Sequence, residues 1–315
     1  MVLLESEYWR LCCDPGVGAQ WLSAEVRKNK HWHSVVPDCR PETLAQASAG
    51  LTPHSSTCEV VKPLTAANFH MIPYSNRIRD GKFTFLGETI ALANSQSHAI
   101  HDALRKLPWQ VIAQDSSSLT CAINSADHQQ VNWPWPIEAT VEQSVDGTEL
   151  RSHLTLWNRG DSPMPAGMGW HPYFLRQVNG SEPTLTLPVT AAFPDHNGDC
   201  LPDGAVTPLP PELDFRQART LDGDQFIDAC LSGLNGTCII DWRNAGIRLL
   251  MQASEICRYL ILYNPNQPYF AVEPVTNAND AFNLASQGIA SGTQVVEPGG
   301  SLSASLSLQV QTQAV

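Results

Sequence analysis

One histidine and one glutamate in the sequence stand where they suit proton transfer. His171 lies in GMGWHPYF, among glycines and large aromatic residues, and Glu273 ends the apolar run YFAVE. Each precedes a proline, which biases the backbone at both positions towards an extended conformation. An imidazole exchanges protons near neutral pH, and a carboxylate is ready to accept one. The two residues are therefore candidates for a general acid and a general base.

Both residues also have a structural interpretation. A histidine in the core can simply bond to a carbonyl group, and Glu273 can lie on the outward face of an alternating strand. Glutamate is rarely buried without a partner, so its place after four apolar residues is informative, although the spacing alone favours the outward-facing position. The residues alone leave these alternatives open.

Two further histidines raise the alternative of a metal site. His98 and His101 lie three residues apart in HAIHD and could combine with His171. The sequence has no H-E-x-x-H pattern and no C-x-x-C pair, and no third ligand follows at a usual spacing. We therefore predict no metal site. Walker and dinucleotide-binding glycine motifs are also absent, which disfavours nucleotide chemistry.

Polar candidates for ligand binding occur in two more segments. Asn76 and Arg77 precede a predicted strand in PYSNRIRDGKF. A guanidinium near a pocket supplies a planar fork of donors that suits hydroxyl or carboxylate oxygens. Asp228 is a single acid between apolar residues in QFIDACLSGL, although the nearby Asp222 and Asp224 compete with it for such a role.

Alternating hydrophobicity predicts the strands that must position these residues. The segment 301–311, SLSASLSLQVQ, is apolar at every second position, as expected for a strand with one buried face. The alternating runs that begin at Ile137 and Leu150 flank Asp146-Gly147, a typical hairpin turn. Further runs of β type span residues 82–92, 184–193, 246–254, 258–264 and 269–275. Packed antiparallel sheets, in a sandwich or a barrel, are the predicted architecture.

One segment has helical spacing and another has none. Ile100, Ala103, Leu104 and Leu107 follow i, i+3, i+4, i+7, which predicts a short helix that ends at Pro108. Residues 193–215 are rich in Pro, Asp and Gly and predict a long surface loop.

Composition bounds the class of protein. The 315 residues are 43% hydrophobic and 16% charged, and no low-complexity linker divides them, so we expect a single domain over 1–315. The net charge of −12, with scattered basic residues, makes nucleic acid an unexpected partner. The N-terminus lacks the pattern of a secretory signal, and no apolar window is long enough for a membrane span. These two absences predict a cytoplasmic protein that does not associate with membranes. The nine scattered cysteines are then expected to be reduced thiols.

Several segments, in chain order, resemble the motifs of the aldose 1-epimerase (galactose mutarotase) family. They are PYSNRIRDGKFTFLG, HAIHDALRKLPW, LTLWNRGDSPMPAGMGWHPYF, FIDACLSG and YFAVEPVTNANDAFN, and the similarity covers roughly residues 69–283. The resemblance implies an all-β fold, a large antiparallel β-sandwich known as the galactose mutarotase-like supersandwich. It also implies a cofactor-free isomerase that interconverts the α and β anomers of a free aldose.

The resemblance assigns a role to each candidate. His171 matches the general acid of the family and Glu273 its general base. The positions that match sugar-binding residues are Asn76, Arg77, His101 and Asp228. One departure is Asp102, where many members have glycine, and it bears on the substrate more than on the reaction.

Other functions stay open at this level. A sugar phosphate as substrate would require basic residues at the rim, for which Arg79, Arg105 and Lys106 are available. A non-catalytic carbohydrate-binding protein could use the same binding groups, although it would not need both an acid and a base. The expected partner is a small sugar, and the chain is either a monomer or a homodimer. We expect the site residues to converge on one concave face, with His171 and Glu273 several ångströms apart rather than in contact.

Overall fold

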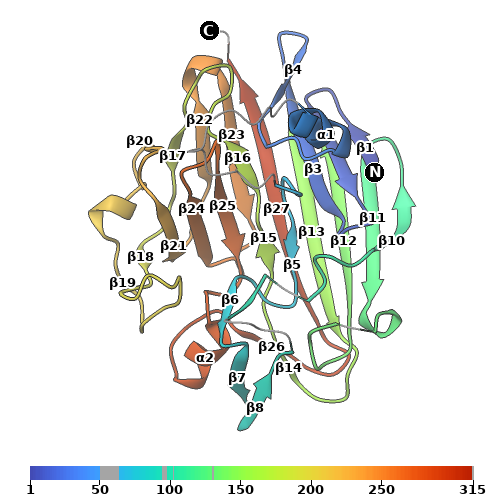
Figure 1. Ribbon diagram of the computed structural model, residues 1–315, viewed down its shortest axis with the longest axis vertical. Coiled ribbons are helices and arrows are strands. Elements are labelled where there is room, and N and C mark those ends of the chain that lie inside the picture. Colours follow the sequence, from blue (N-terminus) through green and yellow to red (C-terminus); the bar gives the residue numbers. More distant parts are fainter. Residues whose placement is uncertain (50–63, 94–97, 102, 130, 314–315) are drawn as a thin grey trace.

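Two large antiparallel sheets form the body of the molecule in the computed structural model (Figure 1). The structure describes residues 1–49, 64–93, 98–101, 103–129 and 131–313. Within these residues, the larger sheet has nine strands. Their order is β10 (Gln110–Gln114), β11 (Ser118–Asn124), β12 (Ile137–Asp146), β13 (Glu149–Asn158), β27 (Ser301–Thr312), β23 (Ile247–Ala253), β22 (Cys238–Trp242), β17 (Thr184–Thr186) and β20 (Arg219–Thr220).

The smaller sheet carries Asp228 and Glu273 of the candidate site, and His171 lies between two of its short strands. Its order in the described chain is β19 (Thr207–Pro208), β18 (Ala191–Ala192), β21 (Ile227–Ser232), β24 (Tyr259–Asn264), β25 (Tyr269–Val275), β15 (Gly169–Trp170) and β5 (His70–Met71). β16 (Tyr173–Leu175) also pairs with β25.

Smaller elements surround the two sheets. A separate sheet contains β1 (Val2–Glu5), β2 (Trp9–Asp14), β3 (Gln20–Lys28) and β4 (His31–Ser34). Three strand pairs are β6 (Arg77–Arg79) with β9 (His98–Ile100), β7 (Lys82–Phe85) with β8 (Glu88–Ala91), and β14 (Met164–Ala166) with β26 (Gln294–Val296). The helices are α1 (Pro41–Ala49) and α2 (Ala281–Ser286), with 3₁₀ turns at Ser125–Asp127, Pro211–Leu213 and Arg243–Ala245. None of the described helices has the length and apolar character needed to cross a membrane.

The strands with the clearest alternation form as predicted. β27 buries Leu302, Leu306 and Val310 on one face, and the intervening polar residues are exposed or, at Ser307, half-buried. β12 and β13 form a hairpin that closes at the pair Asp146–Glu149, and the intervening Gly147 has φ +50°. The positive φ explains the glycine, because other residues adopt this conformation at a cost.

The main core lies between the two large sheets. Leu260 of β24 and Phe270 of β25 belong to the same buried cluster as Leu308 of β27. Two polar bonds join the layers: the indole Nε1 of Trp170 donates to Ser152 Oγ at 2.9 Å, and that of Trp242 donates to the Leu175 carbonyl at 3.1 Å.

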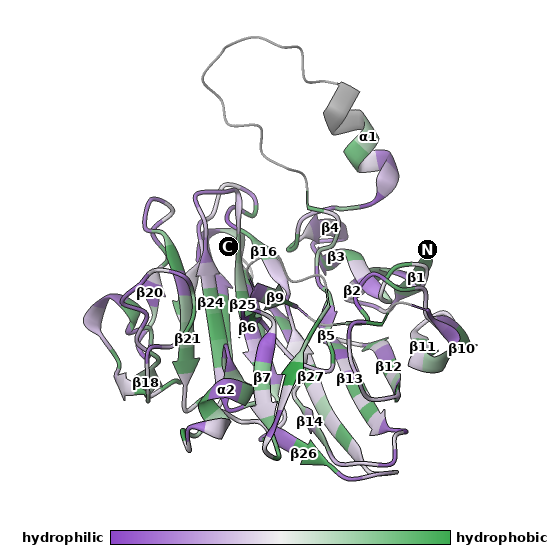
Figure 2. Cartoon of the chain, turned by 60° about the horizontal axis from the view of Figure 1, so that its bottom comes forward, coloured by the Kyte–Doolittle hydropathy of each residue, from purple (hydrophilic) through white to green (hydrophobic). Residues whose placement is uncertain are grey.

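The smaller sheet is covered on its other face as well. Ile261 and Val275 belong to a second buried cluster together with Phe69. Figure 2 accordingly shows β24 and β25 as largely hydrophobic, as expected for strands buried on both sides. Glu273 points to this second face and is 1% exposed. The interpretation of Glu273 as a solvent-facing residue of an alternating strand is therefore wrong.

The predicted helix after Ile100 is also wrong. β9 ends at Ile100, His101 has φ +55°, and the described residues that follow form bends and turns. Leu104 is buried in the main core, so the apolar spacing reflects tertiary packing. A helix of two turns has little stability of its own to oppose such packing. The segment 193–215 is mostly irregular, as predicted, apart from β19 and one 3₁₀ turn.

Candidate active site

A cavity of about 220 Å³ opens on the second face of the smaller sheet. The six residues predicted from the sequence all line it: Asn76, Arg77, His101, His171, Asp228 and Glu273. They come from elements spread over about two hundred residues of the chain. The fold brings them together because strands distant in sequence are neighbours in the sheet.

The register of the sheet places Glu273 and Asp228 on one face. Glu273 of β25 pairs with Ile261 of β24, and Asp228 of β21 pairs with Tyr263 of β24. Ile261 and Tyr263 are two residues apart and therefore point to the same face. The two residues thus lie two strands apart, with roughly 10 Å between the backbones of β21 and β25, and they are offset by two residues along the strands. Tyr263, which pairs with Asp228, lies on the strand between them.

His171 lies at a break between two short strands that pair with β25. Gly169 of β15 pairs with Val275, and Tyr173 of β16 pairs with Ala271, so His171 lies opposite Glu273. The backbone amide of His171 donates to the Phe69 carbonyl at 3.0 Å.

The imidazole of His171 is held among rings. Its ring centroid is 4.5 Å from that of Phe69, 4.5 Å from that of Tyr173 and 5.2 Å from that of His101. These contacts fix the orientation of the ring before any ligand binds.

The candidate acid and the candidate base are in contact. His171 Nε2 lies 3.1 Å from Glu273 Oε1, so the expectation of a gap of several ångströms is wrong. The physical reason is the register, because residues directly opposite on paired strands have Cβ atoms only about 4.5–5.5 Å apart. Each buried group also needs a hydrogen-bond partner, and each lies within reach of the other.

Burial drives both members of this pair towards their uncharged forms. Burial and the charge of Arg105 lower the pKa of His171 to about 3. Burial and the negative charge of Asp228 raise the pKa of Glu273 well above its usual range. Both shifts favour the form of the pair without charges, a neutral imidazole beside a protonated carboxyl group.

Asn76 and His101 present their side chains from strained backbone. Both have φ +55°, and the His101 amide donates to the Asn76 carbonyl at 2.9 Å. The two residues flank the β6–β9 pair, in which Arg77 pairs with Ile100. Positive φ costs free energy at residues other than glycine and is concentrated at functional sites. Burial holds the pKa of His101 well below its usual range, so its ring is neutral.

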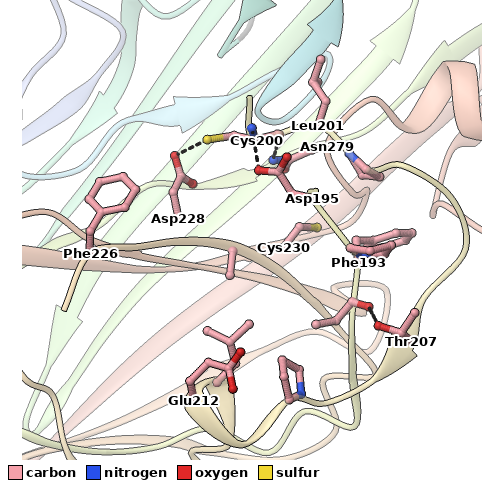
Figure 3. Close-up of a pocket in the computed structure, with 16 residues that line it drawn as sticks. Phe193, Asp195, Cys200, Leu201, Thr207, Glu212, Phe226, Asp228, Cys230 and Asn279 are labelled. Carbon is pink, nitrogen blue, oxygen red and sulfur yellow. Dashed lines mark hydrogen bonds between the residues drawn. The ribbon is translucent and has the colours of Figure 1, made fainter. Parts of the chain in front are cut away.

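Asp228 is held at the far end of the cavity. The thiol of Cys200 donates to Asp228 Oδ2 at 3.0 Å, as Figure 3 shows, and Arg77 Nη2 lies 3.9 Å from the same oxygen. Burial raises the pKa of Asp228. The competing acids Asp222 and Asp224 line a different hollow.

Several buried polar atoms of the cavity have no hydrogen-bond partner among the described residues. They are Asn76 Oδ1, His101 Nδ1, His171 Nδ1 and Glu273 Oε2. Unpaired buried polar atoms cost about 1–3 kcal/mol each, and their grouping in one cavity indicates a site shaped for a polar ligand.

Tyr173, Tyr263 and Ile100 line the cavity but were not predicted as site residues. Tyr173 follows His171 by two residues, so alternation along the strand could have placed it on the same face. Its aromatic neighbours Trp170 and Phe174 belong to the main core instead. No sequence signal distinguishes Tyr263 from other strand residues.

The histidines do not form a metal centre in the described part of the chain, where no group of three or more potential ligands gathers. His98 Nδ1 instead accepts a hydrogen bond from the backbone amide of Asp80 at 3.0 Å. Asp102, the departure noted above, lies outside the described residues.

Comparison with known proteins places the chain in a family. The model of the aldose 1-epimerase family matches residues 55–309. A protein of Escherichia coli K12 called uncharacterized protein YphB is 24% identical over 257 residues, which cover 78% of this chain and 84% of that protein. An aldose 1-epimerase of the same organism is 28% identical over 162 residues, 49% of this chain and 46% of the enzyme.

Solved structures share the fold. A galactose mutarotase-like protein from Clostridium acetobutylicum has a TM-score of 0.80 at 16% identity, over 99% of this chain and 95% of that one. A GalM/aldose epimerase homologue from C. elegans has a TM-score of 0.78 at 15% identity, over 99% of both chains. The fold is therefore galactose mutarotase-like.

The chain belongs to the aldose 1-epimerase family. Membership implies an isomerase of the epimerase type.

Proposed function

We propose that the protein interconverts the α and β anomers of a free aldose, with His171 and Glu273 as the acid and the base. The observation that carries this proposal is the buried contact between His171 Nε2 and Glu273 Oε1 at 3.1 Å, at the edge of a cavity with unpaired polar atoms. A protein that only bound sugar would have no need for a proton-sharing pair in that position.

Anomer exchange needs two proton transfers on oxygens that share one carbon. The base removes the proton of the anomeric hydroxyl, the acid protonates the ring oxygen, and the C1–O5 bond breaks to leave an open-chain aldehyde. Rotation of the C1–C2 bond presents the other face of the carbonyl to the C5 hydroxyl. Ring closure then returns both protons. Each positioned transfer is worth about 10²- to 10⁴-fold in rate.

The short distance within the pair suits this chemistry. The two reacting oxygens are both bonded to C1, so acid and base must reach neighbouring atoms. In the assignment that the family resemblance implies, His171 carries the shared proton and Glu273 accepts one. The neutral form of the pair differs from that state by one proton transfer along the 3.1 Å contact. The pair therefore contains one donor and one acceptor in either form, and ring closure reverses their roles.

The remaining cavity residues supply hydroxyl contacts. Arg77 offers donors, Asp228 offers acceptors, and the neutral His101 has a buried ring nitrogen available for a ligand. Tyr173 and Tyr263 add ring surface against which a sugar can pack.

A sugar phosphate is the second candidate substrate. Arg105 and Lys106 line a hollow of about 300 Å³. This hollow shares Ile100 and His101 with the cavity of about 220 Å³ that contains the candidate site, called the sugar cavity from here on. A phosphate on the sugar would find positive charge there.

Polarimetry tests both candidates. Freshly dissolved α-glucose, α-galactose and glucose 6-phosphate are followed to anomeric equilibrium with and without purified protein. We expect the protein to accelerate the approach to equilibrium for a free aldose. Acceleration for the phosphate alone would favour the second candidate, and no acceleration for any of the three would contradict epimerase activity on these sugars.

A further inference from the structure

A cysteine outside the sugar cavity contacts one of the residues that line it. The thiol of Cys200 donates to Asp228 Oδ2 at 3.0 Å, the dashed line between these two side chains in Figure 3. Cys200 comes from the irregular segment between β18 and β19, whereas Asp228 belongs to β21. The bond therefore joins a loop to the sheet that carries the site, and none of the roles proposed above uses it.

The donor in this contact is a neutral thiol. Burial and the bond to Asp228 raise the pKa of Cys200 to about 12, so the sulfur keeps its proton at neutral pH. Arg77 Nη2 lies 3.9 Å from the same oxygen, which is beyond hydrogen-bond distance. Within the described residues, the thiol is thus the side-chain donor that reaches Oδ2. Because it is uncharged and a weak donor, it orients the carboxylate without neutralising its charge.

The backbone of Cys200 is held in an unfavourable conformation. Its φ is +61°, in the left-handed region that costs free energy at residues other than glycine. Asp195 Oδ2 accepts the Cys200 amide at 2.9 Å, and Asn279 Nδ2 donates to the Cys200 carbonyl at 2.8 Å. Asn279 is itself 2% exposed. Bonds on both sides of Cys200 therefore maintain the conformation in which its sulfur meets Asp228.

The thiol leaves the other oxygen of Asp228 available. In the described part of the chain, Oδ1 accepts no hydrogen bond, and Asp228 lines the sugar cavity. An unrestrained carboxylate has several orientations, and the loss of this freedom on binding weakens affinity. Because Cys200 already holds Oδ2, much of that freedom is lost before a ligand arrives.

We propose that Cys200 is a positioning residue, whose thiol holds Asp228 in the orientation that accepts a sugar hydroxyl. The identity of the ligand rests on the proposed epimerase function, whereas the contact between the two side chains does not. Cys200 does not line the sugar cavity. Its effect should therefore fall on the binding of the sugar, which KM reports, and not on the proton transfers at His171 and Glu273.

The kinetic test compares Cys200→Ala, which removes the donor, with Cys200→Ser, which retains one. Polarimetry gives KM and kcat for a free aldose. We expect Cys200→Ala to raise KM by about 3- to 10-fold, as for one ordinary hydrogen bond, and to leave kcat within about twofold. Cys200→Ser should return KM to within about twofold of the wild type. Cys39→Ala removes a thiol that bonds to the Pro37 carbonyl, and this matched control should change neither constant.

A double variant distinguishes positioning from a general loosening of the loop. Cys200→Ala is combined with Asp228→Ala, and kcat/KM is measured because it does not require saturation. The second change should have no further effect, since the residue through which Cys200 acts is gone. An equal loss in both backgrounds would overturn the proposal, as would a wild-type KM in Cys200→Ala.

The hydrogen bond can also be observed without a sugar. Infrared difference spectra between the wild type and Cys200→Ala isolate the S–H stretch of Cys200, which hydrogen bonding moves to lower frequency. The same difference taken in the Asp228→Ala background should show the band at higher frequency. A band at the same frequency in both backgrounds would show that the thiol does not bond to Asp228, and would overturn the proposal whatever the activity.

Failure of the epimerase proposal gives a different result. If no aldose is turned over, calorimetry of glucose and galactose binding replaces KM by Kd. A Kd that rises about 3- to 10-fold in Cys200→Ala and recovers in Cys200→Ser would support the positioning role in a protein that only binds sugar. A Kd that Cys200→Ala leaves within twofold, or no binding of either sugar to the wild type, would contradict it.

Discussion

The two faces of strand β25 use the same backbone for opposite purposes. The face towards the larger sheet carries Phe270 and Val272, which are fully buried in the main core. The other face carries Glu273, equally buried but in contact with His171. Burial of the apolar face stabilises the fold, whereas burial of Glu273 opposes its charge and raises its pKa. Activity and stability should therefore separate cleanly between adjacent residues of one strand.

The largest expected effect is the loss of activity when residues on the face of β25 that carries Glu273, called the reactive face here, are replaced. His171→Ala and Glu273→Gln should each lower the catalysed rate by at least about 10²-fold, because each removes one partner of the proton transfer. The free energy of unfolding should fall by no more than about 1–3 kcal/mol, the cost of the buried polar atom left without its partner, since neither side chain belongs to the main apolar core. Polarimetry and denaturant unfolding measure the two quantities.

Matched controls are available on exposed positions. His31→Ala and Glu142→Gln make the same chemical changes at exposed residues and should leave both quantities unaltered. Near wild-type rates in both site variants would rule out the proposed pair.

The apolar face should show the reverse pattern. Phe270→Ala should lower the free energy of unfolding by about 3–5 kcal/mol, because it leaves a cavity in the core. At a temperature where the variant is folded, kcat should stay within a few-fold of the wild type. A loss of kcat as large as that of Glu273→Gln would show that the two faces are not independent.

The sequence predicted the strands better than it predicted what covers them. Alternation located β27 and the β12–β13 hairpin because each has one buried face and one solvent-facing face. The same reasoning allowed Glu273 to face solvent, because the residues of β25 do not reveal that other parts of the chain cover both faces of this strand.

The site residues were predicted from their motifs, and the distances between them were not. The contact between His171 and Glu273 follows from the pairing of β15 and β16 with β25. Those strands are two and three residues long, too short to show a period. The false helix after Ile100 has a similar origin, because tertiary burial of Leu104 imitates helical spacing.

A smaller effect is expected at the rim of the reactive face. Arg77→Ala should raise KM by about tenfold and lower kcat less, if its hydroxyl contacts are equal in the ground state and the transition state. Full rate profiles against sugar concentration separate the two constants. A fall in kcat with unchanged KM would instead show that Arg77 stabilises the transition state and not the bound substrate.

The smallest effect is expected on changing pH. The active form of the pair shares one proton between His171 and Glu273. Burial lowers the pKa of His171 to about 3, so a further proton binds only in strong acid. Burial also raises the pKa at which Glu273 loses the shared proton. The catalysed rate should therefore stay level at least between the ordinary values of the two groups, about pH 4.3 to about pH 6.5. Half-loss of kcat/KM near pH 6.5 on acidification would mean that His171 titrates as an ordinary exposed histidine.

The most direct test of a coupled acid–base pair is the double variant His171→Ala/Glu273→Gln. Its kcat/KM for a free aldose is measured by polarimetry beside both single variants, with the uncatalysed rate subtracted. Residues that act as one unit lose their effect together. We predict that the double variant is no slower than the slower single variant. Losses that multiply, so that the double variant is slower by the product of the two single effects, would contradict a shared proton-transfer step.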